Sequence, residues 1–525
     1  MTTRRLPGAS GVAPIELIGL GTLVLVAAVL RFVDLPTRGT WDADQGHDML
    51  VLRDLVLNGQ IPLLGPPTSI GDFHHGVLYY LLLAPVAAVS GADPVAVTGA
   101  IALAGTLAVA VTWWLARSIG GPIAGLLAGL LLAVSSSAVE ESTFIWNPNL
   151  IALSSSIALA AAWRAWTGGR AGWWVVAGAA AVVTMHCHVL GVVLSPVIAG
   201  LLIADIRRRS RSAGGAEPVV RAGLAWLAIA AISYIPLAIH ELTSGGSEIR
   251  AALAFLAEGA PVEVSLPVRI PIVGLRVLAW PLTGLITAAP IAALLAATLV
   301  VSLTFWRVAS SSGDERVAVR WLGLGLAWTV VALALGASGL ATVVLGLPND
   351  HYHAFADPIV VVLVAVGLAP LARVDVPTTG RLPVGAAGAI VVVLAVVGWN
   401  LFHQPAAVTP DGGWPAAIEA GNRILRSLPA GPTEIASLPT AKGPDAVRFP
   451  LVRAGASSPV LVAPTTPPGP DAVARIVLCD DLFQVVIGAP CGGPAEDPAA
   501  TTVGLRLVDR FEAAPGRWVS VYLKG

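Results

Sequence analysis

The chain has 525 residues, of which 56% are hydrophobic and only 12% are charged. A soluble protein of this size would carry about a quarter charged residues, so the composition excludes an ordinary soluble protein and indicates a polytopic membrane protein. The formal net charge of −1 argues against nucleic acid as a partner.

The first apolar run, residues 14–31, follows Arg4 and Arg5 at the N-terminus. It is long and lacks an obvious A-x-A cleavage site, so we expect it to remain in the protein as a helix. Further apolar runs near the ~20 residues needed to cross a bilayer recur along the chain. The predicted spanning helices are residues 14–31, 95–116, 122–139, 149–167, 172–186, 188–206, 219–240, 284–306, 321–346, 357–372 and 383–403.

Arginines between these helices fall in alternate loops, which the positive-inside rule assigns to the cytoplasm. The other loops hold few basic residues and most of the acidic ones. Eleven crossings then place the N-terminus in the cytoplasm and the C-terminus outside, in a multi-pass protein of the cell membrane. The arginines on the cytoplasmic side are Arg4, Arg5, Arg117, Arg164, Arg170, Arg207, Arg208, Arg209, Arg211, Arg221, Arg307, Arg316, Arg320, Arg373 and Arg381.

Residues 76–90 test this topology, because they are apolar but short and contain Pro85. If they crossed the membrane, every later loop would change sides. A run of this length fits an interfacial or re-entrant segment better than a spanning helix. We therefore expect residues 32–94 to form one large outer loop.

Acidic residues and a histidine crowd into residues 39–54, GTWDADQGHDMLVLRD. If this stretch is a helix, Asp44, His47 and Asp48 share one face at i, i+3 and i+4. Asp44, at the start of the helix, could then present a carboxylate towards a cavity at the membrane edge. The alternative is that the acids cap the helix and face water, since Asp is favoured at helix N-termini.

Other polar side chains of the outer face are candidates for binding a substrate. All nine histidines lie on that side or at outer helix ends in the predicted topology. Arginine suits bidentate phosphate binding, although the outer arginines could equally anchor the interface. The HCH stretch 186–188 could suggest a metal, but its side chains cannot all point one way on a helix. The candidates are His74, His75, Trp146, Asn147, Asn149, His188, Arg269, Arg276, His351, Tyr352 and His353.

The character of the chain changes after His403. A Pro/Gly-rich linker is followed by a helix-like pattern over 414–428 and by short strand-like runs. Alternating helix and strand signals indicate a small α/β domain. We expect residues 1–403 to form a membrane domain and residues 404–525 an extracytoplasmic α/β domain. Cys479 and Cys491 lie in the latter, where the compartment permits a disulfide, but the spacing equally allows two free thiols.

Three stretches together resemble a known family. They are WDADQGHDMLVLRDLVLNGQIPLLGPPTSIGDFHHGVLYYLLLAP, then FIWNPNLIAL, then HCHVLGVVLSP. As a set they are similar to the GT-C membrane glycosyltransferases, in the branch of protein mannosyltransferases and lipid A aminoarabinose transferases with RgtA/B/C/D-like bacterial relatives. The resemblance covers roughly residues 15–240 and, more loosely, the rest of the membrane part.

The resemblance implies an enzyme that takes a sugar from a polyprenyl-phosphate donor. It would transfer the sugar outside the membrane to a glycan, lipid or protein of the cell envelope. A first-loop carboxylate is the base in this family, which by position is Asp44, with Asp42 as the second candidate. The family often has Asp-Glu here, whereas this chain has Asp44 followed by Gln45. That departure weakens a metal-bridging role, so no cofactor is assigned and a divalent ion is left open.

Two other functions fit parts of the sequence. A transporter or flippase of lipid-linked sugars would explain the number of helices, but it predicts ionisable residues at mid-membrane, where the spans hold few. A membrane scaffold that binds through its outer domain would leave the clustered outer acids and histidines unexplained. The glycosyltransferase is the leading hypothesis.

Overall fold

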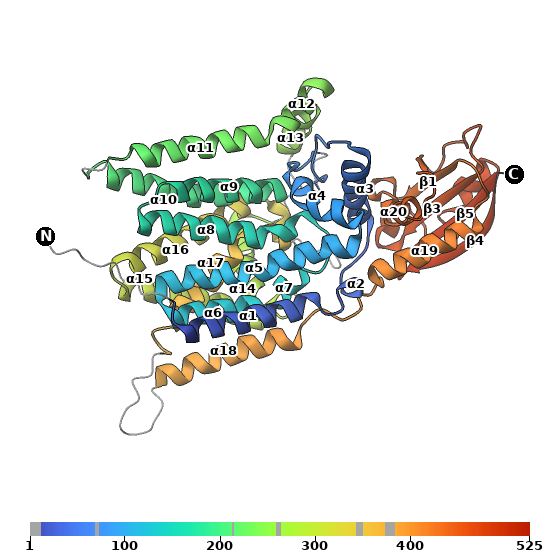
Figure 1. Ribbon diagram of the computed structural model, residues 1–525. Coiled ribbons are helices and arrows are strands. Elements are labelled where there is room, and N and C mark those ends of the chain that lie inside the picture. The colour runs from blue at the N-terminus through green and yellow to red at the C-terminus, as the bar shows by residue number, and fades with distance from the viewer. Residues whose placement is uncertain are drawn as a thin grey trace.

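The computed structural model describes residues 12–68, 73–212, 215–258, 264–342, 350–372 and 384–524. Long helices lie side by side in one bundle, and a smaller domain with a sheet lies beyond one end of it (Figure 1). Two shorter helices, α3 (Ala43–Asn58) and α4 (Leu78–Ser90), lie between bundle and domain. We call this end of the bundle the α3 end. The predicted fold class, a mainly helical membrane bundle with a C-terminal α/β domain, is confirmed.

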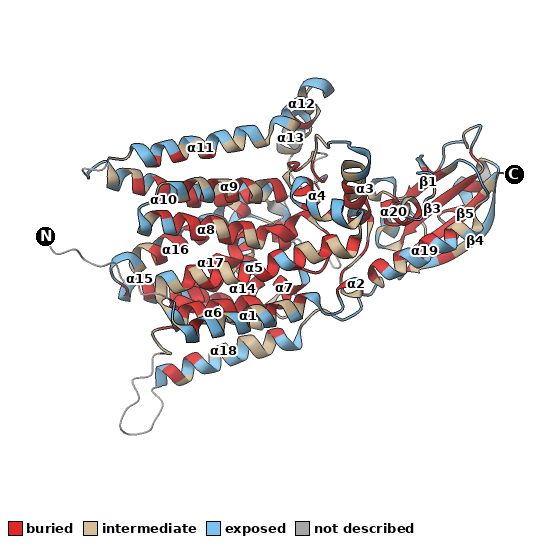
Figure 2. Cartoon of the chain, in the orientation of Figure 1, coloured by how far each residue is buried: buried red, intermediate tan, exposed pale blue. Residues whose placement is uncertain are grey.

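The outer faces of the bundle carry exposed apolar side chains, and its interior is buried (Figure 2). Such a surface is stable only against lipid or another apolar layer. The long and medium helices are α1 (Pro14–Phe32), α5 (Pro94–Gly120), α6 (Pro122–Val134), α8 (Ile151–Gly168), α9 (Gly172–Cys187), α10 (Leu194–Arg209), α11 (Glu217–Ser233), α15 (Pro290–Ser310), α16 (Gly313–Gly336), α17 (Asp357–Leu368) and α18 (Val384–Phe402).

The number of spans differs from the eleven that we predicted. Nine helices in the described ranges are long and apolar enough to cross a membrane, or ten if the bent pair α11 and α12 (Ile235–Ser244) is one span. The segments predicted at 122–139 and 172–186 form helices of 13 and 16 residues. The first of these ends at Ser135, whose hydroxyl instead caps the short helix α7 (Ser136–Glu140).

Helix α14 (Leu266–Thr283) was not among the predicted spans, and its Arg269 and Arg276 were assigned to an outer loop; two internal prolines and these two arginines interrupt its apolar sequence. Helix α14 is one of the nine counted by length and composition, but the contacts of both its halves are at the α3 end of the bundle. Arg269 bonds the carbonyl of Ala334, near the end of α16, and Trp280 bonds Glu141, which follows α7. Because contacts from both halves of α14 lead to the same end, α14 leaves the alternation of the other helices unchanged.

Other predicted bounds shift by several residues. The segment 284–306 is α15, which begins at Pro290, and the segment 321–346 is α16, which begins at Gly313 and so includes Arg316 and Arg320. The last part of the segment predicted at 321–346, residues 343–346, lies outside the described residues. Arg4, Arg5, Arg373 and Arg381 also lie outside them.

Residues 76–90 form α4, a helix of 13 residues with Pro85 inside it. At 1.5 Å per residue it rises about 20 Å, too little for a hydrocarbon core of about 30 Å. It lies beside α3 at the α3 end of the bundle, where it also packs against α5 and α9. This length and place agree with the predicted interfacial segment.

The C-terminal domain is a five-stranded mixed sheet of order β2-β1-β3-β5-β4. Strand β1 pairs in parallel with β2 and β3, and β5 is antiparallel to both β3 and β4. Cys479 and Cys491 are joined by a disulfide with an S–S distance of 2.06 Å. The elements are α19 (Gly413–Ser427), β1 (Thr433–Leu438), α20 (Asp445–Arg453), β2 (Val460–Leu461), β3 (Ala474–Asp480), α21 (Gln484–Ile487), α22 (Asp497–Thr502), β4 (Leu505–Ala514) and β5 (Arg517–Lys524).

The two domains meet where α20 packs on α3. The indole of Trp41 donates a 2.8 Å hydrogen bond to the carbonyl of Ala446, and its ring centroid lies 4.4 Å from that of Trp414 on α19. Gly46 faces the backbone of Asp445 so closely that a Cβ at this position would overlap the Asp445 carbonyl. The absence of a side chain at residue 46 therefore sets how near the C-terminal domain can approach.

Gly46→Ala should push α20 away from α3. We expect it to cost about 2 kcal/mol, the usual scale of an overpacked contact, and to open the linker at residues 404–412 to protease. Limited proteolysis and thermal unfolding of the purified protein measure both effects. Gly388→Ala in α18 is the matched control, because an added Cβ there meets open space. Equal protection of the linker in both variants would contradict this account of the interface.

Candidate active site

Helix α3 begins at Asp42, whose carboxylate is fully engaged. It accepts a 2.7 Å hydrogen bond from the backbone N–H of Ala43, while the Gln45 amide oxygen accepts the N–H of Asp42 at 2.8 Å, which together make a capping box. The same carboxylate forms ion pairs with Lys442 at 2.5 Å and Arg517 at 2.8 Å. Desolvation acts to raise the pKa of Asp42, but the two cations outweigh it and the pKa is lowered. Asp42 thus has a structural role at the N-terminus of the helix.

Asp44, the second residue of the helix, is different. Its side chain is exposed, and within the described residues it makes no hydrogen bond and no ion pair. Neighbouring atoms nevertheless crowd it, and this loss of hydration raises its pKa, with Lys442 opposing the shift. Asp44 is therefore the carboxylate of this helix that is open to an incoming group.

His47 and Asp48 lie on the same helix in buried or half-buried positions. Burial raises the pKa of Asp48 to about 7, against the opposing effects of His47 and of a 2.7 Å hydrogen bond from the Tyr80 hydroxyl. His47 Nδ1 lies 3.1 Å from Asp445 of α20. Desolvation lowers the pKa of His47, but Asp445 and the nearby Asp48 and Asp44 carboxylates raise it by more. On this face of α3, Asp44, His47 and Asp48 thus interact electrostatically, and His47 connects them to Asp445 of the C-terminal domain.

A series of rings begins beside α3. The Gln45 side-chain amide donates a 2.8 Å hydrogen bond to the carbonyl of Ile145, which fixes the turn that carries Trp146. The centroids of Trp146 and Tyr352 are 5.6 Å apart, and Tyr352 stacks on His188 at 4.2 Å with an interplanar angle of 12°. His188 in turn lies 4.8 Å from His75. We call Trp146, Tyr352, His188 and His75 the ring wall.

Both histidines of the ring wall have a fixed tautomer. The backbone N–H of Val189 donates to Nδ1 of His75, and that of Leu190 donates to Nδ1 of His188, each at 3.2 Å. A nitrogen that accepts a hydrogen bond carries no proton, so in each neutral ring the proton is on Nε2. Burial lowers the pKa of His75 to about 3 and that of His188 well below its usual value. Each ring therefore presents a neutral N–H donor.

The remaining predicted site residues are engaged in structural contacts. Arg276 pairs with Asp350 at 2.5 Å and bonds the carbonyls of Leu340 and Thr342, and Arg269 bonds those of Ala334 and Val264. Neither arginine is available as the phosphate ligand that the sequence suggested. The side-chain amides of Asn147 and Asn149 donate hydrogen bonds to the carbonyls of Cys187 and Phe144. The rings of His353 and His74 contact the carboxylates of Asp350 and Glu248, and the ring of His351 lies among those of Phe144, Trp146 and Trp280.

Sequence reasoning missed the groups that the C-terminal domain supplies, namely Lys442, Asp445 and Arg517. Their positions in the chain are 400 to 475 residues beyond Asp42, so no local pattern connects them. One signal was present: Lys442 is one of only two lysines in 525 residues.

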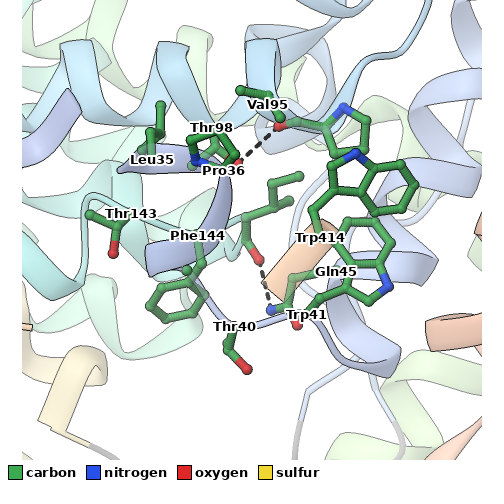
Figure 3. A pocket seen from close by; sticks show the side chains of 13 residues that line it. Leu35, Pro36, Thr40, Trp41, Gln45, Val95, Thr98, Thr143, Phe144 and Trp414 are labelled. Carbon is green, nitrogen blue, oxygen red and sulfur yellow. Dashed lines mark hydrogen bonds between the residues drawn. The ribbon is translucent and has the colours of Figure 1, made fainter. Parts of the chain in front are cut away.

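Two cavities border this region. The pocket in Figure 3 lies between Trp41, Gln45, Phe144 and Trp414, and its volume of about 20 Å³ suits water and not a sugar. A larger groove of about 420 Å³ has mainly apolar walls and lies between the first loop and the helices α12 and α13 (Ser247–Glu258). Its lining residues are Phe73, His74, Tyr234, Leu237, Ala238, Glu241, Glu248, Ile249 and Ala252.

A metal site is not formed by the described part of the chain, where no three His, Cys, Asp or Glu side chains gather closely enough to hold an ion. The HCH stretch shows why. His186 contacts Ser233 through Nε2 at 2.9 Å, His188 uses Nδ1 for the backbone, and Cys187 is buried.

Comparison with known proteins identifies the fold. Residues 74–235 match the profile of the family described as dolichyl-phosphate-mannose-protein mannosyltransferase. ArnT from Cupriavidus metallidurans, solved with undecaprenyl phosphate, is 14% identical with a TM-score of 0.61, over 97% of this chain and 98% of ArnT. The oligosaccharyltransferase AglB from Archaeoglobus fulgidus, solved with an inhibitory peptide and a dolichol-phosphate, is 13% identical with a TM-score of 0.55. The match covers 98% of this chain and 74% of AglB. No curated protein matches the chain in sequence. The predicted resemblance to the GT-C membrane glycosyltransferases is confirmed.

The raised pKa of Asp48 predicts a pH-dependent stability. The native carboxyl holds its proton up to a pH of about 7, whereas in the unfolded chain it ionises near 3.9. The native state then binds more protons than the unfolded state between these values, so this residue lowers stability as pH rises through them. Asp48→Asn removes the titration and keeps an acceptor for Tyr80. We expect its thermal midpoint relative to wild type to improve between pH 4 and pH 8.

The quantity compared is the difference between the thermal midpoints of Asp48→Asn and wild type at each pH, so that the contributions of the other titrating groups cancel. Asp54→Asn is the control, because Asp54 is half-buried on the same helix and, within the described residues, its carboxylate bonds only Asn58. A difference for Asp48→Asn that stays constant with pH would refute the buried, protonated state.

Proposed function

We propose that the protein is a membrane glycosyltransferase that moves a sugar from a polyprenyl-phosphate donor to an acceptor hydroxyl outside the membrane, with Asp44 as general base. The observation that carries this proposal is the Asp44 carboxylate, which has no hydrogen bond or ion pair within the described residues and lies at the start of α3, the helix whose Gln45 bonds the turn that carries Trp146. The fold similar to ArnT and AglB and the match of residues 74–235 support the donor class.

The proposed reaction follows from these groups. Asp44 accepts the proton of the acceptor hydroxyl while the acceptor oxygen attacks the anomeric carbon. The bond from this carbon to the phosphate oxygen breaks, and the phosphate leaves with the electron pair. The raised pKa of Asp44 brings its proton affinity closer to neutral pH, where a carboxylate base is more effective.

The ring wall supports the binding of the donor head group. The Nε2–H donors of His75 and His188 provide hydrogen bonds for phosphate oxygens or sugar hydroxyls, and Trp146 and Tyr352 give flat apolar faces against which a sugar ring can pack. The groove of about 420 Å³ between the first loop and α12–α13 offers apolar space for part of the prenyl chain.

A transporter of lipid-linked sugars is less well supported. Such a protein needs ionisable side chains at mid-membrane. In the described helices that run through the bundle, the buried Asp, Glu and Arg side chains lie near helix ends, and the buried Arg269 and Arg276 belong to α14 at the α3 end: the former are Glu16 and Arg31 in α1, Asp205 in α10, Arg307 in α15 and Asp357 in α17. The polar groups are thus placed at the surfaces of the bundle and not along a path through it.

Asp44→Asn keeps the size of the side chain and removes the base. We expect transfer from the active polyprenyl-phosphate sugar to fall ~10²–10⁴-fold, the usual contribution of general base catalysis. Binding of the polyprenyl phosphate itself should change little. Purified protein is assayed in detergent or liposomes against a panel of donors, and binding is measured separately with undecaprenyl phosphate.

Asp42→Asn is the matched control, two residues away. Asn also caps helices well, so this variant should lose part of its domain docking but keep most of its turnover. Near-normal transfer by Asp44→Asn together with collapse in Asp42→Asn would move the base to Asp42. Normal transfer by both single variants and by the double variant would exclude this helix from catalysis.

His188→Gln and His188→Asn test the ring wall. Glutamine places an amide donor near the position of Nε2, whereas asparagine reaches only the position of Nδ1. We expect Gln to retain more donor affinity than Asn, with the larger change in the Michaelis constant for the donor. Equal loss in both variants would indicate that the ring is needed for stacking and not for its N–H.

A further inference from the structure

Gln45 directly follows the proposed base in the chain, and its side-chain amide is buried. The amide oxygen accepts the backbone N–H of Asp42 at 2.8 Å, and the amide nitrogen donates a 2.8 Å hydrogen bond to the carbonyl of Ile145 (Figure 3). Glutamate would make the capping bond equally well, and a helix N-terminus favours its negative charge. A carboxylate, however, has no proton to donate to a carbonyl. The bond to Ile145 therefore accounts for an uncharged amide at residue 45.

This bond reaches the turn that carries Trp146, and a second buried amide holds the other end of the turn. The side-chain nitrogen of Asn147 donates to the carbonyl of Cys187, the residue before His188. Trp146 lies between the two attached residues, is half-buried, and packs its ring against that of Tyr352. The turn is thus tied on one side to α3 and on the other side to the segment that carries His188.

One hydrogen bond therefore connects the proposed base to Trp146 of the ring wall. Gln45 follows Asp44 directly and Ile145 precedes Trp146 directly, although Gln45 and Ile145 are 100 residues apart along the chain. A misplacement of about 1 Å between reacting groups can slow a reaction on the order of 100-fold. The bond of Gln45 is placed where it limits such a misplacement between the carboxylate and the ring.

We propose that Gln45 is a positioning residue of the transfer site: its amide, bonded to the carbonyl of Ile145, holds the ring of Trp146 at a fixed place relative to Asp44. A sugar packed against that ring then presents its anomeric carbon to the acceptor hydroxyl whose proton Asp44 takes. This inference rests on the proposed function and adds to it the alignment of the sugar. Gln45 itself neither touches the substrate nor transfers a proton.

Gln45→Met removes the donor and keeps a side chain of similar volume. The carbonyl of Ile145 then loses its partner, and the turn can shift relative to α3. We expect kcat/KM for the active polyprenyl-phosphate sugar to fall ~10-fold, the scale of an unsatisfied buried carbonyl, with part of the loss in KM. The affinity for undecaprenyl phosphate, which carries no sugar, should stay unchanged. A variant that is merely less stable would instead lose turnover and undecaprenyl-phosphate sites together, at an unchanged KM.

Gln45→Glu adds a pH signature. The introduced carboxyl still accepts the N–H of Asp42; when protonated it also donates to the carbonyl that the amide bonds, and when ionised it repels that carbonyl. Its charged neighbours are Asp42 and Asp44 on α3, with Lys442 and Arg517 paired to Asp42. Dividing kcat/KM by the wild-type value at each pH removes the titration that both proteins share. This ratio should be near one at acidic pH and fall about tenfold as the pH rises through the pKa of the introduced carboxyl, which burial raises.

Gln404→Met is the matched control. The half-buried amide of Gln404 donates to the carbonyls of Val134, at 2.8 Å, and Asn400, and within the described residues it bonds neither α3 nor the turn of Trp146. This variant should keep the wild-type kcat/KM and KM.

Four results would overturn the role of Gln45. They are a wild-type kcat/KM in Gln45→Met, a loss that Gln404→Met reproduces, and a ratio for Gln45→Glu that does not change with pH. The fourth is a loss of sugar transfer with an equal loss of affinity for undecaprenyl phosphate, because Gln45 would then support the fold and not the alignment.

The outcomes also distinguish this inference from the proposed function. If wild-type protein transfers no sugar from any polyprenyl-phosphate donor, or if Asp44→Asn is as active as wild type, the proposed function fails. If wild type is active and Asp44→Asn is not, but Gln45→Met transfers sugar as wild type does, only the inference about Gln45 fails.

Discussion

The ion-paired cap at Asp42 is the constraint on which the rest of the site depends. A desolvated carboxylate at a helix N-terminus is stabilised by the helix dipole and by the backbone N–H that it accepts, but these do not offset its burial alone. Lys442 and Arg517 complete the compensation, and both belong to the C-terminal domain. The position of α3 is therefore defined jointly by the membrane bundle and by a domain about 400 residues away in the chain.

Three aspartates on one helix acquire different properties from this arrangement. Asp42 is held ionised by two cations, Asp48 is buried against Tyr80 and retains its proton to a pH of about 7, and Asp44 is exposed and unpaired within the described residues. Separating the proton affinities of neighbouring carboxylates by their environments is a common way to assign one of them to proton transfer. In the proposed reaction the other two have structural and electrostatic roles.

The sequence predicted most of the fold and part of this site. Each of the eleven segments predicted from apolar runs and arginine alternation overlaps a helix, and the short strand-like runs of the C-terminal part all became strands of the sheet. The helix α14 was missed because its prolines and arginines resemble a loop, and only tertiary contacts such as Arg276 with Asp350 show how those charges are accommodated. The same contacts explain why the arginines could not be judged from residue type: a charge that suits a phosphate equally suits carbonyls and a buried carboxylate. Asp44 was singled out from the crowding of acids in residues 39–54 and, through the family resemblance, ahead of Asp42, and its role stays a prediction. Lys442, Asp445 and Arg517 could not be found in this way, because their approach is fixed by packing around Gly46 and Trp41.

The disposition of the arginines has a consequence for how an anion would be held at the α3 end. Arg269 and Arg276 are buried and use their donors on backbone carbonyls and on Asp350, so they hold α14 against its neighbours. What remains at the ring wall are neutral donors, the Nε2–H groups of His75 and His188. A neutral donor costs far less to desolvate than a cation, and its hydrogen bond strengthens as negative charge builds up on its acceptor. A site of this kind binds a monoanionic diester modestly and favours the monoester phosphate that forms as the sugar departs, which is the differential stabilisation that catalysis requires.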